Sequence, residues 1–292
     1  MLVRRFLVPC SLAAVVAAGC GAAGEQQPPL RTAPAYESLT PYITLPPAFE
    51  GRLLYYNGFE RPDGQPEIDR SEARQGGRLD LSAEGLFGRG AVTGEGKVLS
   101  LRSDAFSPHR PLTISLWWAL EADLEVDQGF GLVHLGAKKG YVAHFCRGKG
   151  NWCALQRPAA VLQVYYVPGI KNVNGIYDRD LMAHLDLRRG VWHHTALVFR
   201  GGSLIEVYTD GETDWELRVR GRSFRQADGF GQLTLGTRGT PRMVIDEVLV
   251  LRQALRPADI RTYVAALRQM RQARYLRPWA RRRSRGRATP GN

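Results

Sequence analysis

The chain has 292 residues, a formal net charge of +12, 32 glycines and 17 prolines. All but one of the charged residues from Arg252 to the C-terminus are arginines, so nearly all of the net charge lies in that arm. The charge pattern excludes a uniformly basic folded body, and the glycine and proline content excludes a mainly helical one. The length suits one all-β domain, because sandwiches and barrels often exceed about 200 residues as a single unit.

Residues 1–20 have the layout of an export signal. Two arginines precede an apolar run from Phe6 to Val16 that is too short to span a bilayer, and small residues lead to Cys20. The A-A-G-C sequence resembles the bacterial lipoprotein signal, in which the cysteine is lipidated, although the common form has leucine where Ala17 stands. An ordinary signal cleaved near Ala23 is the alternative.

A lipidated Cys20 would be a stable membrane anchor, because several acyl chains on one residue bind far more strongly than one. Gly21 follows the cysteine, which by resemblance favours the outer membrane. Residues 21–48 are rich in proline and lack hydrophobic periodicity, which predicts an extended tether. We therefore expect an exported, lipid-anchored envelope protein in the outer membrane of a Gram-negative bacterium.

The folded part is predicted to begin with four strands separated by turns. In the clearest of them, Pro111–Leu120, alternate side chains share a face, with Trp118 on one side and Trp117 on the other. The four predicted strands are Gly51–Glu60, Gly76–Leu81, Gly96–Arg102 and Pro111–Leu120.

The C-terminal half carries the strongest hairpin signal. Alternating apolar residues from Val191 to Phe199 and from Leu204 to Thr209 are separated by two glycines, and Asp210-Gly211 predicts a second tight turn.

Taken together, these segments resemble concanavalin A-like, laminin G-like jelly rolls in their order and spacing. The resemblance spans about residues 50–265 and implies an all-β, two-sheet antiparallel sandwich over residues 49–256. This fold serves binding modules and glycan-cleaving enzymes alike. The matching segments are Leu112–Trp118, Gly190–Phe199, Val207–Gly211, Gly231–Gly236, Ile245–Val248 and Ala254–Ile260.

The segment between Gly129 and Asp186 is more irregular and contains the candidate ligand-binding aromatics. An aromatic ring packed against a sugar is a common lectin contact, but aromatic residues also fill sandwich cores. The candidates are Tyr141, Trp152, Tyr165 and Tyr166.

Cys146 and Cys153 enclose a short glycine-containing segment. Export into an oxidising compartment favours a disulfide between them. A metal site that adds His144 is the alternative, although it lacks a convincing fourth ligand.

Glu121, Asp123 and Glu125 are the catalytic candidates. On a strand the three carboxylates would share one face, as the acid and the nucleophile of a glycosidase must, and they resemble the E-x-D-x-x-E strand of laminarinase-type hydrolases. The glycine and hydrophobic residues that flank that motif in the hydrolases are absent, and so is their cluster of cleft tryptophans. A solvated acidic loop is the alternative, and we expect no enzyme activity.

His193 and His194 are expected on opposite faces of their strand, one in the core or hydrogen-bonded and the other at a surface. Trp118 and Trp192 are expected in the core.

Glu60 and Asp246 are the metal candidates. In many laminin G-like relatives an acidic residue after the first strand and the aspartate of the final strand hold a structural Ca²⁺, and hard oxygen ligands suit that ion. Asp246 alternates with Val244 and Val248, so we expect it to be buried, where an ion pair or a backbone hydrogen bond would equally satisfy it.

Residues 257–277 predict a helix, with apolar residues at three- and four-residue steps, that is expected to end at Pro278. Residues 278–292 are expected to be disordered. Export makes anionic lipid or acidic polysaccharide a better partner for this segment than nucleic acid, and a solvated tail without a partner is the alternative. The polyanion-binding candidates are Arg281, Arg282, Arg283, Arg285 and Arg287.

The sequence thus predicts a non-catalytic envelope lipoprotein that binds a glycan or a surface protein through a laminin G-like domain. A glycan-cleaving enzyme using Glu121 and Glu125 is one alternative. A structural envelope protein held by its basic tail is the other.

Overall fold

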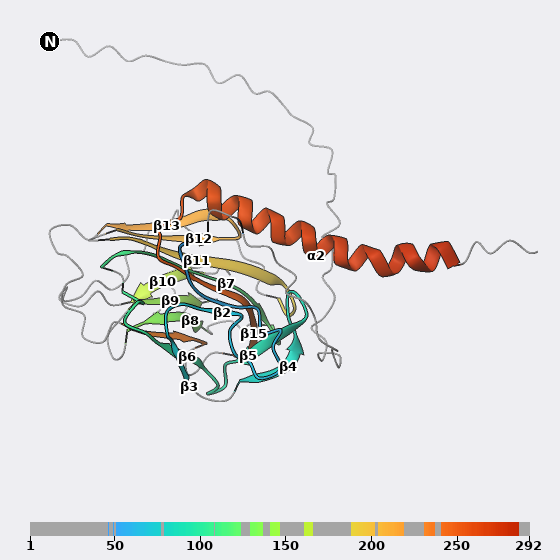
Figure 1. The fold of residues 1–292 in the computed structure, drawn as a ribbon, viewed down its shortest axis with the longest axis horizontal. Helices are drawn as coiled ribbons and strands as arrows, with labels where there is room; N and C mark the ends of the chain where they lie inside the picture. The colour runs from blue at the N-terminus through green and yellow to red at the C-terminus, as the bar shows by residue number, and fades with distance from the viewer. Residues whose placement is uncertain are drawn as a thin grey trace, which may run out of the picture.

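The structure is a computed structural model, which describes residues 46, 49, 51–76, 79–107, 109–123, 129–136, 141–146, 161–165, 188–201, 204–218, 231–236 and 241–285. Within these residues the chain forms two antiparallel β-sheets and one C-terminal helix (Figure 1). The all-β, two-sheet sandwich that the sequence predicts is confirmed. No helix in the described part of the chain is both long and apolar enough to cross a membrane.

The first sheet has the order β13-β12-β11-β7-β15-β1-β2, with β5 paired to β15 and β4 to β5. Its long central strands bury the side chains of both faces. The strands are β1 (Leu53–Asn57), β2 (Ile68–Asp69), β4 (Asp80–Glu84), β5 (Arg89–Thr93), β7 (Pro111–Leu120), β11 (Trp192–Arg200), β12 (Leu204–Thr209), β13 (Glu212–Arg218) and β15 (Met243–Leu251).

The second sheet has the order β10-β9-β8-β14-β6-β3. Its strands are shorter, and two of them, Leu99–Arg102 and Gln232–Leu235, alternate between buried and less buried residues, as strands with one face in the core do. They are β3 (Arg74–Gly76), β6 (Leu99–Arg102), β8 (Gly129–Leu135), β9 (Tyr141–Cys146), β10 (Val161–Tyr165) and β14 (Gln232–Leu235).

The two faces of the first sheet pack against different layers. Leu116 and Trp118 of β7 belong to the core between the sheets. Trp117 and Ala119 belong to a second core that includes Tyr263 of α2. The alternation predicted for this strand is confirmed, and Trp118 and Trp192 are buried as expected.

The helix α2 (Pro257–Arg285) covers this second core with its first half and extends past the edge of the sandwich with its second (Figure 1). Its buried residues follow a helical spacing: Ile260, Tyr263, Val264 and Leu267.

The helix is longer than predicted, because it continues through Pro278 to Arg285. A proline removes one backbone donor, and the arginines and alanines around it are strong helix formers. Four of the five arginines expected in a disordered tail, Arg281, Arg282, Arg283 and Arg285, therefore lie in the helix, and Arg287 lies outside the described residues.

Candidate functional site

The structure brings the two metal candidates, Glu60 and Asp246, to one glycine turn. The turn is closed by a hydrogen bond from the Gly85 N–H to the Gly88 carbonyl (3.1 Å). A Cβ atom on Gly85 would lie 2.5 Å from Asp246 Oδ2, and one on Gly88 would overlap the Glu60 carboxylate. Both carboxylates therefore pack against backbone that only glycine leaves open.

Asp246 is fully buried, as predicted, and its oxygens accept backbone hydrogen bonds from Phe87 (3.0 Å) and Glu247 (2.8 Å). Its neighbour Glu247 is also buried and has a φ of 53°, which is unusual for a residue with a side chain. Tyr56 donates its hydroxyl hydrogen bond to Glu247 (3.1 Å). A β-bulge in β15 thus places two consecutive carboxylates inside the protein.

The electrostatics of this cluster are unfavourable to negative charge. Burial raises the pKa of Asp246 well above its ordinary value, and repulsion from Glu247 and Glu60 adds to the rise. Burial likewise raises the pKa of Glu247, with repulsion from Glu67 and Glu60. A cation would relieve this repulsion.

The carboxylate oxygens of Glu60 and Asp246 are suitable ligands for Ca²⁺, which proteins usually bind through carboxylate and backbone carbonyl oxygens. Two carboxylates alone do not complete such a site. Among the described residues no group of three or more His, Cys, Asp or Glu side chains is arranged to hold a metal ion. Glu60 and Asp246 would therefore need backbone oxygens of the surrounding turns to complete the shell.

The structure describes two of the three catalytic candidates, and the carboxylate of each already has a partner. Strand β7 ends at Leu120, so Glu121 and Asp123 follow the strand rather than extend it. Glu121 forms an ion pair with Arg242, and Asp123 accepts a hydrogen bond from the Arg189 N–H (2.6 Å). Glu125 lies outside the described residues.

The structure describes the backbone of two of the four aromatic candidates. Tyr141 begins β9 and Tyr165 ends β10, where Tyr165 pairs with Val142, so their backbones lie at the same end of neighbouring strands. Trp152 and Tyr166 lie outside the described residues.

Of the three cysteines singled out in the sequence, the structure describes one. Cys146 is the last residue of β9, whereas Cys20 and Cys153 lie outside the described residues. The disulfide and the lipidation remain predictions.

His193 and His194 do point to opposite faces, but both are buried, whereas the sequence predicted one at a surface. The His193 ring packs on Trp118, and its Nδ1 atom lies 2.9 Å from Asp210. The His194 ring packs on Trp117, and its Nε2 atom lies 2.8 Å from the Ser115 hydroxyl. Helix α2 covers the second face, which accounts for the difference.

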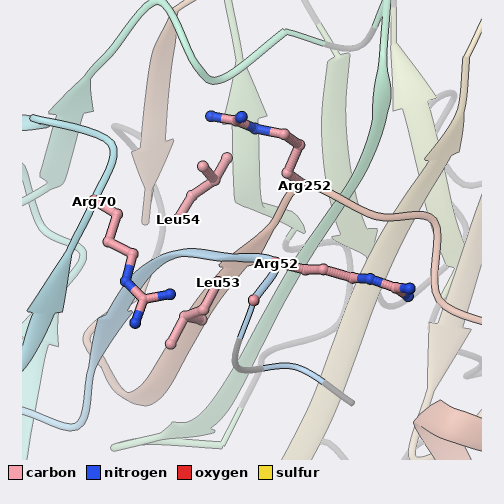
Figure 2. A pocket seen from close by; sticks show the side chains of 6 residues that line it. Arg52, Leu53, Leu54, Arg70 and Arg252 are labelled. Carbon is pink, nitrogen blue, oxygen red and sulfur yellow. The ribbon is translucent and has the colours of Figure 1, made fainter. Parts of the chain in front are cut away.

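Sequence reasoning missed a pocket of about 210 Å³ at the start of β1. We call it the arginine pocket. Its three arginines come from the start of β1, from the segment after β2 and from the end of β15, and Figure 2 shows their side chains around Leu53 and Leu54. No sequence motif joins these arginines, because only the pairing of the strands brings them together. The lining residues are Gly51, Arg52, Leu53, Leu54, Arg70 and Arg252.

Comparison with known proteins supports the architecture. The chain resembles a solved structure of botulinum neurotoxin type C, a toxin whose cell entry is dependent upon interaction with two ganglioside molecules, with a TM-score of 0.53 and 11% sequence identity. It also resembles the binding domain of botulinum neurotoxin DC in complex with SialylT, with a TM-score of 0.51 and 11% identity.

Each of these alignments covers 75% of this chain and 52% of the other, so the chain spans about half the length of the structures it matches. Neither a family model nor a curated protein sequence matches the chain. At this identity the similarity shows the fold alone, a two-sheet β-sandwich.

Proposed function

We propose that this protein is a non-catalytic cell-envelope lipoprotein whose β-sandwich binds a carbohydrate. The observation that carries the proposal is the arginine pocket, a hollow of about 210 Å³ lined by three arginines, whose guanidinium groups can donate hydrogen bonds to a polar ligand. The fold similarity to receptor-binding domains adds support. A surface protein that presents the same chemistry is the related alternative. The laminin G-like assignment, which rests on the sequence motifs, belongs to this proposal.

A glycan array with the full-length protein tests the proposal. We expect binding to a restricted set of glycans, and a reducing-sugar assay should detect no release from the bound ones. Failure to bind any glycan would overturn the carbohydrate part of the proposal.

The glycan-cleaving alternative is disfavoured because the Glu121 and Asp123 carboxylates already have partners. A general acid must instead face its substrate with a raised pKa. Reducing-sugar release that is abolished in the double variant E121Q/E125Q would reverse this choice.

Attachment to the membrane is proposed on the sequence. Cys20 would be the lipidated residue, and residues 21–48 would separate the sandwich from the bilayer. Labelling with a radioactive fatty acid should depend on Cys20, and an unchanged signal in C20S would remove the anchor.

The structural alternative has support from one feature, the arginine-rich second half of α2 that extends past the sandwich. Basic residues near an anionic surface contribute about 1 kcal/mol each, and salt screens this attraction. We propose acidic lipid or polysaccharide as the partner of this segment. Deleting residues 278–292 should lower the salt concentration needed to extract the protein from envelopes, and an unchanged salt profile would exclude the role.

A structural Ca²⁺ at Glu60 and Asp246 is part of the proposal. Its support is that the buried Asp246 carboxylate and the enclosed carboxylate oxygens of Glu60 both pack against the Gly85–Gly88 turn.

A further inference from the structure

Two arginines lie directly opposite each other on the outer face of the second sheet. In the pairing of β3 with β6, Arg74 is the partner of Arg102, and Gln232 of β14 continues the same row. Directly paired residues of an antiparallel ladder share one face, with Cβ atoms about 4.5–5.5 Å apart. Both arginines are exposed, so their charges meet at the surface of the protein.

The described part of the chain provides no counter-charge for this pair. Among the described residues neither guanidinium group forms an ion pair or a hydrogen bond, although Glu72 and Asp104 lie two residues away along the chain. Like charges directly opposite each other on neighbouring strands are destabilising. A bound anionic group would remove this repulsion, and two guanidinium forks can share the oxygens of one carboxylate.

A row of smaller residues lies beside the arginines on the same face. It crosses β3, β6, β14 and β8 as Gly76, Ser100, Thr234 and His134. The Gln232 amide donates a hydrogen bond to the Ser100 hydroxyl (3.3 Å) and so joins the two rows. Burial lowers the pKa of His134, so its neutral ring offers one donor and one acceptor at pH 7. A Cβ atom on Gly76 would meet only Ser100, at 3.6 Å, so this end of the row is open.

The two rows form a hydrophilic face that the helix does not cover. The outer face of the first sheet packs against α2, whereas β3 and β6 lie on the side of the sandwich away from α2 (Figure 1). The alternate residues of β6 and β14 are leucines that point into the core between the sheets. Three steps between neighbouring strands, each about 4.8 Å, make the second row about 14 Å wide. The face therefore has room for a short extended chain.

We infer that these two rows bind an acidic glycan, with Arg74 and Arg102 on a uronate carboxylate and the second row on neighbouring hydroxyl groups. This inference rests on the proposed carbohydrate-binding function and adds a surface that is separate from the arginine pocket. Serine, threonine and neutral histidine side chains both donate and accept hydrogen bonds, as sugar hydroxyl groups do. Their polarity favours such a ligand over an apolar partner, which would need hydrophobic area to bind.

The experiment measures binding of the full-length protein to a glucuronate-containing oligosaccharide and to the same oligosaccharide after its carboxyl groups are reduced to alcohols. Polyglutamate forms a third arm, because it carries carboxylates without sugar hydroxyl groups. The variant is R74Q/R102Q. The control R110Q/R261Q removes the same charge from exposed arginines outside the two rows, and R52Q/R252Q removes it from the arginine pocket.

We expect R74Q/R102Q to bind the acidic oligosaccharide at least roughly tenfold more weakly than the wild-type protein, because it loses charged hydrogen bonds. Both control variants should keep the wild-type affinity. Reduction of the carboxyl groups should cost the wild-type protein as much affinity as R74Q/R102Q loses, and polyglutamate should bind more weakly than the glycan.

A second variant, R102E, tests the pairing without relying on a loss alone. It places opposite charges at directly paired positions, so it should resist urea better than the wild-type protein while binding the glycan no better than R74Q/R102Q. Unchanged or lower stability of R102E would show that the two side chains do not interact, which would overturn the inference. Circular dichroism checks that every variant is folded.

Other outcomes would separate the inference from the proposed function. Loss of binding in R52Q/R252Q but not in R74Q/R102Q would overturn the inference and leave the proposed function standing. Equal losses in R74Q/R102Q and R110Q/R261Q would mean general charge attraction, and equal binding of polyglutamate would assign the face to an acidic polypeptide. Either result would also overturn the inference. Absence of binding to any glycan would remove both the inference and the proposed function.

Discussion

Arg268 of α2 forms an ion pair with Asp210 at the tight turn between β12 and β13, with a nitrogen-oxygen distance of 2.9 Å. The same carboxylate accepts a hydrogen bond from the His194 N–H (3.0 Å) and lies 2.9 Å from His193 Nδ1. One side chain thus joins the helix, the turn and strand β11.

The first prediction concerns this junction. Burial opposes the charge of Asp210, but the hydrogen bond with His193 and the charges of His193 and Arg268 lower its pKa overall. D210N keeps a side chain that tolerates the positive φ of 55° at this turn but removes the charge. We expect D210N to lower the free energy of unfolding by about 1–3 kcal/mol, measured by urea denaturation.

R268Q should cost less than about 1 kcal/mol, because Arg268 is half exposed and the backbone donor to Asp210 remains. R261Q is the control, since Arg261 lies 4.0 Å from Glu212 and both are exposed, and it should have no measurable effect. If R268Q were as damaging as D210N, the ion pair rather than the turn would be the stabilising element.

The second prediction is a pH dependence that comes from His194. Burial lowers its pKa from 6.5 to about 3, while Asp210 raises it and Arg268 lowers it. The folded protein therefore keeps this imidazole neutral, whereas the unfolded chain binds a proton below pH 6.5. Stability is present above that pH and is lost as the pH falls towards 3, by up to about 1.4 kcal/mol per pH unit.

Comparing the wild-type protein with H194Q separates the pH dependence that comes from His194 from that of the other titrating groups. Asp246 and Glu247 have raised pKa values, so their contribution changes in the opposite direction and is lost as the pH rises. Urea denaturation of both proteins at about pH 7 and about pH 5 should show a smaller loss of stability on acidification in H194Q. An identical loss in both would show that His194 is not the titrating group.

The sequence predicted best those elements whose own residues determine them. Pro111–Leu120 and Leu204–Thr209 agree with β7 and β12 at both ends, because long alternation and glycine-containing turns are local signals. β2 and β3 have two and three residues and exist through their partners. The predicted strand Gly76–Leu81 contains only the end of β3 and the start of β4.

The site was less accessible to sequence reasoning. Glu60 and Asp246 were found because each occupies a motif position of its own. The arginine pocket was missed, because Arg52, Arg70 and Arg252 are single residues at strand ends with no shared spacing. The burial of both His193 and His194 was missed too, because the helix that covers His194 comes much later in the chain.

The third prediction concerns calcium. If Glu60 and Asp246 hold an ion, adding Ca²⁺ to protein treated with a chelator should raise the melting temperature. The gain in free energy would be about 2.7 kcal/mol at a hundredfold excess over the dissociation constant. E60Q and D246N should lose the response, whereas D80N should keep it, because Asp80 lies at the start of β4, at the opposite end from the Gly85–Gly88 turn, and pairs with Lys97 (2.7 Å). A wild-type protein that does not respond would remove calcium from the proposal.

The fourth prediction tests the close packing of the Gly85–Gly88 turn. A Cβ atom at Gly85 would overlap the Arg89 carbonyl and lie 2.5 Å from Asp246 Oδ2. Gly85 has no positive φ, so G85A adds steric overlap without backbone strain. We expect G85A to lower the free energy of unfolding by about 1–3 kcal/mol, as overpacking does in a dense interior.

G76A is the matched control, because a Cβ atom at Gly76 would meet only Ser100, with the Ser100 Cβ at 3.6 Å, an ordinary contact. Replacing that glycine should be neutral or stabilise by up to about 1 kcal/mol, since alanine restricts the unfolded chain. Thermal and urea denaturation of both variants measure the difference. If G85A were as stable as G76A, the turn could move away from Asp246, and the carboxylates would not be held as closely as the candidate cation site requires.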